Sequence, residues 1–426
     1  MRISLLPARI GAVQPPGAAL LLACFANLAC SAALPAARAV TSGAAPADTI
    51  VSRELAPGVS YRKVVDAAGP WVMHVVRVSL RQDGIELREG RALDRLTGRE
   101  RTSAIARRAE ERGVTVLAAV NADFFDLETG ENENNQVIAG EWWKGLKTTD
   151  SPYDTFDNAH VQLAIDASGH PVIDRFILDA RAWARGVTTP ILTLNHAPTG
   201  SYEGTALYTP RFGPSTPPLS PSLPRDTART IAEAVLEGAG SRGDTLLMVR
   251  RGAIRSSTGA GIPPTGAVLS AYGSRVREVQ AMADGDTVKI LLATQPRLAR
   301  GAAPRLLIGG WPRLLRDGEN VAGEAATVEG TISRNAEIRH PRTVVGISQD
   351  GETLTLLTVD GRSKASVGMT LVEVAERLRR LGVWNAMNFD GGGSTAMVLG
   401  GALVNVPSDS AGERAVGNAL LVVRRR

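Results

Sequence analysis

The hydrophobic and polar positions predict a chain with more strands than helices. β-branched and apolar residues run through 71–80 with partial alternation, and an unbroken apolar run fills 114–120. Short runs of this kind, bounded by turn residues, are typical of strands. Similar runs occupy 246–250, 287–292, 306–308, 354–359, 385–389 and 418–423, and residues 396–399 with 402–406 have the pattern of a hairpin.

Two segments have the spacing of helices. Residues 103–112 predict a short helix that Gly113 closes. The second helix is expected over 370–381, where Thr370 and Glu373 can form a capping box. Its apolar face is formed by Leu371, Val374, Ala375, Leu378 and Leu381.

This balance of elements predicts an α+β fold, with a strand-rich mixed sheet core and a few covering helices. We expect one large domain over residues 66–426, preceded by a flexible lead at 40–65. Within it, the segment of about 195–330 has the least recognisable pattern. Residues 209–226 are rich in Pro, Ser and Thr, which predicts a surface loop rather than an independent domain.

The N-terminal residues 1–39 have the pattern of a signal peptide. Arg2 and Arg9 precede the apolar stretch 17–25, and residues 35–39 supply a small-residue cleavage pattern. We therefore expect an exported protein, periplasmic or extracellular, whose mature chain begins near residue 40. A lipoprotein anchored through Cys24 is the alternative. No later segment is apolar for about 18 residues, so no transmembrane span is expected.

Charge and composition argue against nucleic acid as a partner. The formal charge is +5, but the basic residues are dispersed among the acids and aromatic residues make up only 4%. A nucleic-acid binder should instead have a basic face with interleaved aromatic residues. Removal of residues 1–39 takes away three arginines and no acids, which lowers the formal charge to +2. It also removes both cysteines, and with them disulfide and thiolate chemistry. No oligomeric state is indicated.

The sharpest local feature is the run Asn388-Phe389-Asp390-Gly391-Gly392-Gly393-Ser394-Thr395. Consecutive glycines weaken regular structure, so they indicate close backbone approach or positive φ. Such a loop exposes N–H groups that can cradle anionic oxygens, and Ser394 and Thr395 add hydroxyl donors. The run lacks the lysine of a P-loop, the spacing of a dinucleotide fingerprint and the final glycine of a nucleophile elbow.

Other polar residues also follow predicted strands. Asp360 and Arg362 follow the run 354–359, Arg342 lies in the segment 339–343, and Asn121 and Asp123 follow 114–120. Arginine suits phosphate through its planar fork, and carboxylates suit glycosidic chemistry. Together these residues are the parts needed to cut a bond next to a phosphate.

The motifs in this order resemble the phosphodiester glycosidase family. The resemblance rests on residues 341–346, 359–362, the helix from Thr370, 388–395, and 407–409 with Arg414. It is strong over 335–423 and weaker over 115–145. It implies hydrolysis of a sugar-1-phosphodiester, possibly of the N-acetylglucosamine type, at its glycosidic bond, with a free sugar and a phosphomonoester as products.

The resemblance also implies roles for the residues. Asp360 and Asp390 become candidates for nucleophile, base or oxocarbenium stabiliser, and Asn121 and Asn388 for orienting the sugar or the catalytic groups. The leaving phosphate would be bound by Arg342, Arg362, Arg414, Gly391, Gly392, Gly393, Ser394 and Thr395.

One position departs from the family pattern. Asp123 replaces a family glycine, which puts an additional carboxylate beside the expected site. It could serve in catalysis, or hold Ca²⁺ or Mg²⁺, although the expected reaction requires no cofactor.

Two other classes of function fit the same residues. Asp123, Asp360 and Asp390 could hold Ca²⁺ or Mg²⁺ in a metal-dependent phosphodiesterase or nuclease, although the five histidines are dispersed. A non-catalytic glycan-binding envelope protein is the third class, with Trp142-Trp143 as a sugar platform.

Overall fold

The computed structural model describes residues 48–147, 159–197, 204–219, 230–299, 303–330 and 337–425. The expected signal peptide, residues 1–39, lies outside these ranges. The flexible lead is wrong for its second part, because residues 48–65 belong to a strand pair, β1 (Asp48–Ala56) and β2 (Val59–Asp66). Val59 and Tyr61 of β2 are buried, and this apolar alternation ties the segment to the core.

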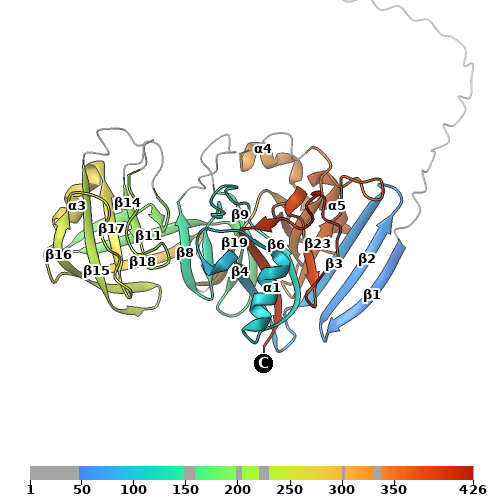
Figure 1. Cartoon of the computed structure of the whole chain (residues 1–426), viewed down its shortest axis with the longest axis horizontal. Coiled ribbons are helices and arrows are strands. Elements are labelled where there is room, and N and C mark those ends of the chain that lie inside the picture. Colours follow the sequence, from blue (N-terminus) through green and yellow to red (C-terminus); the bar gives the residue numbers. More distant parts are fainter. Residues whose placement is uncertain are drawn as a thin grey trace, which may run out of the picture. The chain divides into compact units, whose positions relative to one another are not determined.

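The described strands form three large sheets and one small one (Figure 1). The eight-stranded sheet has the order β1, β2, β3 (Trp71–Ser79), β23 (Thr353–Val359), β22 (Arg342–Ile347), β24 (Asn385–Asn388), β20 (Arg313–Arg316), β21 (Glu319–Asn320). The five-stranded sheet has the order β26 (Ala402–Leu403), β25 (Met397–Leu399), β6 (Thr115–Asn121), β28 (Asn418–Arg424), β4 (Ile85–Arg91). A small sheet pairs β27 (Ala415–Val416) with β5 (Glu100–Arg101).

The largest sheet has thirteen strands and includes most of the segment 195–330. Its order is β10 (Pro171–Arg175), β9 (Val161–Asp166), β19 (Pro304–Gly309), β7 (Gln136–Ile138), β8 (Glu141–Leu146), β13 (Thr193–Leu194), β14 (Thr205–Tyr208), β17 (Ala267–Tyr272), β15 (Ile231–Arg242), β16 (Thr245–Arg255), β18 (Thr287–Gln295), β11 (Ile177–Ala184), β12 (Val187–Ile191). The sheets are mixed only at β13–β14, the one parallel pair among the described strands.

Few helices accompany these sheets, as expected. They are α1 (Thr102–Glu111), α3 (Val276–Gln280), α4 (Ala325–Val328) and α5 (Leu371–Arg380), with 3₁₀ turns at Ala92–Asp94, Gly273–Arg275, Ala322–Glu324 and Gly392–Ser394. The predicted capping box is confirmed, since the Glu373 N–H donates to Thr370 Oγ1 over 3.1 Å and the Thr370 N–H donates to Glu373 Oε2 over 2.9 Å. No helix among the described residues is long and apolar enough to cross a membrane.

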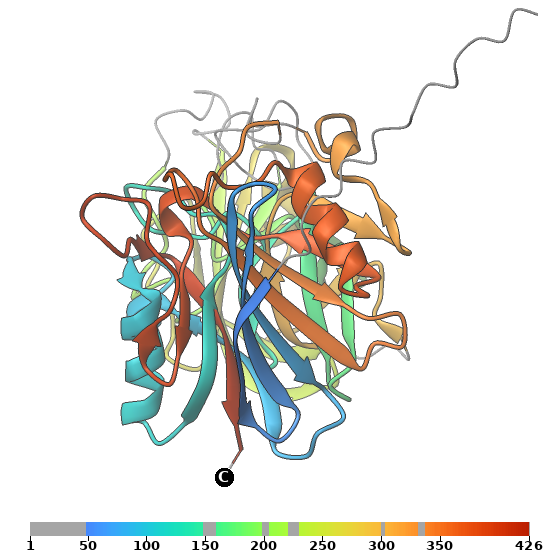
Figure 2. The ribbon, with the colours of Figure 1, turned by 90° about the vertical axis from the view of Figure 1, so that its right-hand side faces the viewer.

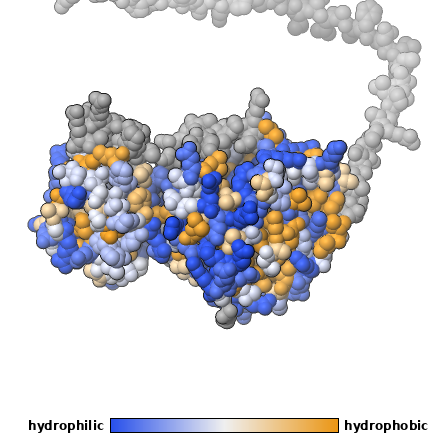
Figure 3. Space-filling view, in the orientation of Figure 1, coloured by the Kyte–Doolittle hydropathy of each residue, from blue (hydrophilic) through white to orange (hydrophobic). Residues whose placement is uncertain are grey.

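All three large sheets contribute to one hydrophobic core, and helices cover two of these sheets from outside (Figure 2). Val76 and Leu356 of the eight-stranded sheet belong to the same buried cluster as Val120 and Leu420 of the five-stranded sheet. α5 packs its apolar face on the other side of the eight-stranded sheet, and α1 packs on the five-stranded sheet. Hydrophilic residues gather over α1 in the space-filling view (Figure 3).

Candidate active site

Strand direction brings the predicted site residues to one edge of the eight-stranded sheet. β22 lies between β23 and β24 and is antiparallel to both. The carboxyl ends of β23 and β24 therefore meet the amino end of β22 at the same edge. Asp360 directly follows β23, Asp390 is the second residue after β24, and Arg342 begins β22.

Asn121, at the end of β6, joins the five-stranded sheet to this edge. Its Nδ2 donates to the Asp390 carbonyl over 2.6 Å. Its Oδ1 accepts hydrogen bonds from Thr343 Oγ1 at 2.7 Å and from the Ala396 N–H at 3.0 Å. The side chain is fully buried. Its contacts are those of a residue that positions the loop after β24.

Glycines let three chain segments touch at this edge. A Cβ on Gly361 would lie 2.7 Å from the Pro341 nitrogen, and a Cβ on Gly391 would lie 2.7 Å from the Pro341 carbonyl oxygen. The Gly392 N–H donates to that same carbonyl over 2.9 Å. Any side chain at Gly361 or Gly391 would push these backbones apart, so the glycines serve close approach.

The Asp390 carboxyl lies half-buried beside this loop. The Gly391 N–H donates to its Oδ1 over 2.8 Å. Burial raises the pKa of Asp390 to about 6, against the lowering effects of the Ser394 hydroxyl, Arg414 and the Gly391 N–H. The negative charge of Asp123 raises this pKa further. Carboxyl groups with raised pKa values in such surroundings are typical of acid–base sites.

Asp123 lies next to Asp390 and is 2% exposed. The Asp390 N–H donates to the Ala122 carbonyl over 2.8 Å, which puts the two chain segments side by side. Asn134 donates to both oxygens of Asp123, from Nδ2 over 2.7 Å and from its backbone N–H over 3.2 Å. Burial raises the pKa of Asp123 to about 6, although Asn134, Lys144 and His160 act to lower it.

These contacts bear on the metal expected at Asp123. Both of its carboxylate oxygens already accept hydrogen bonds from Asn134. In the described ranges no three His, Cys, Asp or Glu side chains form a metal-binding group. A Ca²⁺ or Mg²⁺ ion at Asp123 stays a prediction without support from this geometry.

Two arginines, Arg362 and Arg414, lie against residues 391–395, the glycine loop. Arg362 has a positive φ of 58° and lies over Gly392, where an added Cβ would be 2.9 Å from Nη2. Arg414 lies over Gly393 and contacts Ser394 Oγ at 3.5 Å. Asp409 joins them, at 2.8 Å from Arg414 Nη2 and 3.9 Å from Arg362 Nη1. The arginine side chains are 42% and 37% exposed, so both can meet a ligand.

The sequence predicts that Arg342 binds the phosphate, but its side chain is directed into the protein. Its guanidinium is buried and donates from Nε to the Met369 carbonyl over 2.9 Å and from Nη2 to the Ile338 carbonyl over 2.8 Å. Burial, and then the charge of Arg362, lower its pKa to about 10. Arg342 therefore fixes the backbone around Ile338 and Met369, next to the site.

Asn388 and Thr395 are also turned inward. Asn388 Nδ2 donates to the Trp311 carbonyl over 2.7 Å. Thr395 is 3% exposed, and its hydroxyl has no hydrogen-bond partner within the described part of the chain. Ser394 is the hydroxyl of the loop that reaches Asp390 and Arg414.

Asp360 lies apart from Asp390, in a buried polar chain. The Val406 N–H donates to its Oδ1 over 3.1 Å, and His74 Nε2 lies 3.5 Å from its Oδ2. His74 Nδ1 in turn contacts the Tyr61 hydroxyl at 2.8 Å. With β22 between β23 and β24, the backbones of Asp360 and Asp390 are about 10 Å apart. Asp123 is therefore the carboxylate better placed to act together with Asp390.

The sequence pattern did not reveal the importance of Asn134. It belongs to the polar run 131–136, which a solvated loop would also explain. The available signal was the pair Gly309-Gly310. A Cβ on Gly309 would lie 2.2 Å from Asn134 Cβ, and a Cβ on Gly310 would lie 2.4 Å from the Asn388 carbonyl oxygen. The two glycines thus pass between Asn134, which binds Asp123, and the end of β24, which leads to Asp390.

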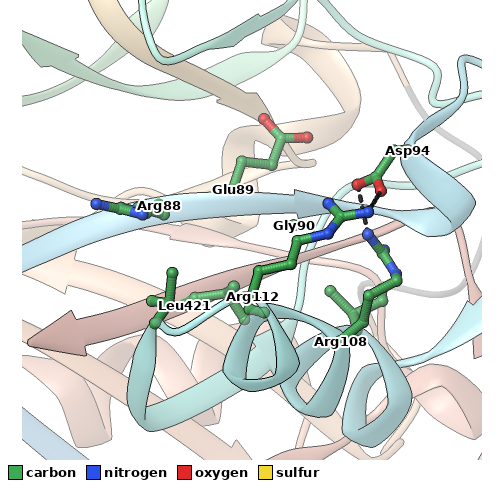
Figure 4. Close-up of a pocket in the computed structure, with 10 residues that line it drawn as sticks. Arg88, Glu89, Gly90, Asp94, Arg108, Arg112 and Leu421 are labelled. Carbon is green, nitrogen blue, oxygen red and sulfur yellow. Dashed lines mark hydrogen bonds and ion pairs between the residues drawn. The ribbon is translucent and has the colours of Figure 1, made fainter.

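A hollow between β4 and α1, away from these residues, does not form a comparable site (Figure 4). Arg108 and Arg112 both point toward Asp94 and form ion pairs with it. Arg88 is paired with Glu86 at 3.1 Å. The arginines of this hollow are thus paired with neighbouring carboxylates, and no residue of the loop 391–395 lines it.

Comparisons with known proteins bear on the same part of the chain. Residues 239–423 match the phosphodiester glycosidase family. The resemblance expected from the motifs is therefore confirmed over this range, which contains Arg342, Asp360, Arg362, Asp390 and Arg414. Asn121, Asp123 and Asn134 lie outside it.

Curated relatives match over a short stretch. The mouse N-acetylglucosamine-1-phosphodiester alpha-N-acetylglucosaminidase is 37% identical over 102 residues, which cover 22% of this chain and 19% of that protein. The prophage-derived uncharacterized protein YomE of Bacillus subtilis is 38% identical over 96 residues, covering 22% of this chain and 15% of YomE. The matched stretch thus spans about a fifth or less of the length of these relatives.

A solved structure shows the fold over a longer range. A hypothetical protein from Synechocystis superposes with a TM-score of 0.69, at 23% identity, and covers 90% of this chain and 64% of its own. At this identity the likeness concerns the fold alone.

Proposed function

We propose that this protein is a hydrolase that cleaves the glycosidic bond of a sugar-1-phosphodiester in a glycan or glycoconjugate. The observation that carries the proposal is the placement of Asp390. The charge of a second carboxylate, Asp123, raises the pKa of Asp390, while Ser394 and Arg414 lower it, so that acidic and basic groups meet around this carboxyl. The family match over 239–423 supports a glycosidase that acts on phosphodiesters.

The two sides of the loop suit the two halves of such a substrate. Asp390 and Asp123 form the acidic side, where they can stabilise the positive charge that develops at the anomeric carbon and take a proton from water. Arg362 and Arg414 form the cationic side, where they can stabilise the charge that grows on the leaving phosphate.

The bond changes balance without a further reactant. The bond between the anomeric carbon and the phosphate oxygen breaks, and its electron pair stays on the phosphate. Water supplies the hydroxyl group that bonds to the anomeric carbon. Its proton passes to a carboxylate of the Asp123–Asp390 pair, and the products are a free sugar and a phosphomonoester. The name of the mouse relative makes N-acetylglucosamine the first sugar to test.

Hydrolysis in ¹⁸O-water tests the proposal directly. We expect the label in the released sugar, because the carbon–oxygen bond breaks. Label in the phosphate would instead show a phosphodiesterase, and loss of that activity with EDTA and its recovery with Mg²⁺ would make the enzyme metal-dependent. Glycan binding without turnover of any diester across a broad sugar panel would leave a binding protein.

Asp390→Asn should reduce kcat by about 10²- to 10⁴-fold, the range for loss of a side chain that transfers a proton in the transition state. The exposed Asp83 offers a matched control, and Asp83→Asn should retain wild-type kcat. Circular dichroism of both variants checks the fold. If Asp390→Asn keeps more than a tenth of wild-type kcat, Asp390 does not have the central role.

We also propose that the protein is exported, on the basis of the signal-peptide pattern over residues 1–39. Intact-mass measurement of protein recovered outside the cytoplasm should show a chain that begins near residue 40. A lipid-modified chain beginning at Cys24, or a full-length chain found in the cytoplasm, would contradict this.

A further inference from the structure

His340 lies at the same edge of the sheet, in a tightly held backbone. Its N–H donates to the Met369 carbonyl over 3.2 Å, and the Met369 N–H donates back over 3.0 Å. Gly368, with a φ of +86°, allows this approach, because a Cβ there would lie 2.5 Å from the His340 carbonyl oxygen. The next residue, Pro341, accepts the hydrogen bond from Gly392. The ring therefore starts from a fixed position beside the glycine loop.

The contact with Arg362 defines the state of the imidazole. Arg362 Nη2 lies 3.3 Å from His340 Nδ1. A guanidinium has only donors, so Nδ1 must be the acceptor. Burial, followed by the charges of Arg342 and Arg362, lowers the pKa of His340, which favours the neutral ring at neutral pH. A neutral ring that accepts at Nδ1 carries its proton on Nε2.

The half-buried His340 extends the row of hydrogen-bond donors that Arg362 and Arg414 form along the loop. Arg362 contacts His340 at one end and lies over Gly392, and Asp409 links Arg362 to Arg414 over Gly393. We propose that His340 is a third phosphate-binding residue, which donates a hydrogen bond from Nε2–H to a non-bridging oxygen of the substrate phosphodiester. This inference rests on the proposed function and adds a contact on its leaving-group side.

A neutral histidine has a specific use beside two arginines. It adds a donor to the phosphate without adding a third positive charge. His340 keeps its Nε2 proton throughout, because loss of that proton from a neutral imidazole would leave an imidazolate anion. The hydrogen bond strengthens as negative charge grows on the departing phosphate, and such strengthening lowers the barrier for bond cleavage.

Two substrates with the same sugar separate this contact from a general structural role. One is the sugar-1-phosphodiester, and the other is the matching glycosyl fluoride, whose small leaving group cannot reach a phosphate subsite. The variants are His340→Ala and His340→Gln, because the glutamine side-chain amide can present a donor near the position of Nε2. The exposed His170 provides a control, His170→Ala.

We expect His340→Ala to lower kcat/KM for the diester by about 10- to 100-fold, the range for loss of one hydrogen bond to a charged group. Its kcat/KM for the fluoride should stay within about threefold of wild type, and His340→Gln should recover most of the diester activity. Inorganic phosphate should inhibit fluoride hydrolysis by wild type and His340→Gln more strongly than by His340→Ala. His170→Ala should behave as wild type.

Other outcomes overturn the inference. Equal losses on both substrates would show that His340 supports the fold or the acidic side instead. An unchanged diester rate in folded His340→Ala would show that His340 does not bind the phosphate. The proposed function would not be affected by that result. A wild-type protein that turns over neither substrate would contradict the proposed function itself, and the inference with it.

Discussion

The residues around Asp390 fall into two groups. Some form hydrogen bonds with the backbone and are buried, and others are partly exposed to solvent. Asn121 and Arg342 are buried and donate to backbone carbonyls, so they set the positions of other groups. Arg362 and Arg414 remain partly exposed and contact the glycine loop, so they can exchange solvent for substrate. The same residue types therefore have different roles, and the hydrogen-bond partners decide which.

Asp123 should make folding stability depend on pH in a characteristic direction. Its pKa is raised from 3.8 to about 6, so the ionised form is disfavoured in the folded chain. Its contribution to stability is full below pH 3.8 and is lost as the pH rises through 6. We expect the stability of Asp123→Asn, relative to wild type, to improve by about 2–3 kcal/mol between pH 4 and pH 7.5.

Denaturant unfolding of both proteins at the two pH values measures this difference. The loss of hydrogen bonding to Asn134 adds an offset that is much the same at both pH values. Asp83→Asn, at an exposed position, should show no such pH-dependent difference. A relative stability of Asp123→Asn that falls as the pH rises would show that Asp123 ionises easily in the folded state.

At the scale of elements, the site depends on where strands end and how closely they pass. β22 places the ends of β23 and β24 at one edge, and β6 brings Asn121 and Asp123 to it from the other sheet. The carboxyl end of β19 adds Gly309-Gly310, which passes between Asn134 and Asn388. Through these contacts, the end of β19 helps to position Asn134 and, through it, Asp123.

Gly309→Ala should therefore impair both stability and activity. Its Cβ would lie 2.2 Å from Asn134 Cβ, and Asn134 is held by its hydrogen bonds to Asp123. We expect a loss of about 1–3 kcal/mol in unfolding free energy, the usual range for overpacking, together with a lower kcat. Gly323→Ala is the matched control, because nothing lies within 4 Å of its added Cβ. Equal stabilities of the two variants would contradict the tight passage.

The local parts of this arrangement follow from the sequence, and the long-range parts do not. The capping box of α5 joins residues three apart, and the strands β3, β6 and β28 have apolar runs that show in short windows. The direction of the Arg342 guanidinium depends on Met369, 27 residues away, and no local pattern records it. Asn134 becomes important only through Asp123 and Gly309, which different strands bring to it.

At the scale of the whole chain, the family match covers only part of the site. Residues 239–423 include the arginines and Asp390, whereas Asn121 and Asp123 come from residues before them. β23 pairs with β3, and β25 and β28 pair with β6, so strands on both sides of residue 239 share sheets. The matched range is thus a part of a larger folded unit.

A fragment of residues 239–426 should fail to fold into an active form. It lacks β3 and β6, which would leave β23, β25 and β28 with unpaired edges and exposed apolar faces. We expect an insoluble or unfolded fragment without hydrolase activity, whereas residues 44–426 should fold and retain it. Solubility, circular dichroism and diester turnover of the two chains measure this. A folded and active 239–426 fragment would show that the earlier strands are dispensable.

The Asn121 side chain has a consequence for the order of events during folding. It bonds to partners 269 and 222 positions away, at Asp390 and Thr343. Such distant pairs meet late, since the chain must first close long loops. We therefore expect catalytic competence only after the segment around Asn121 has met the segments around Thr343 and Asp390. During refolding, the return of turnover marks the completion of the tertiary structure, after the local strands and helices have formed.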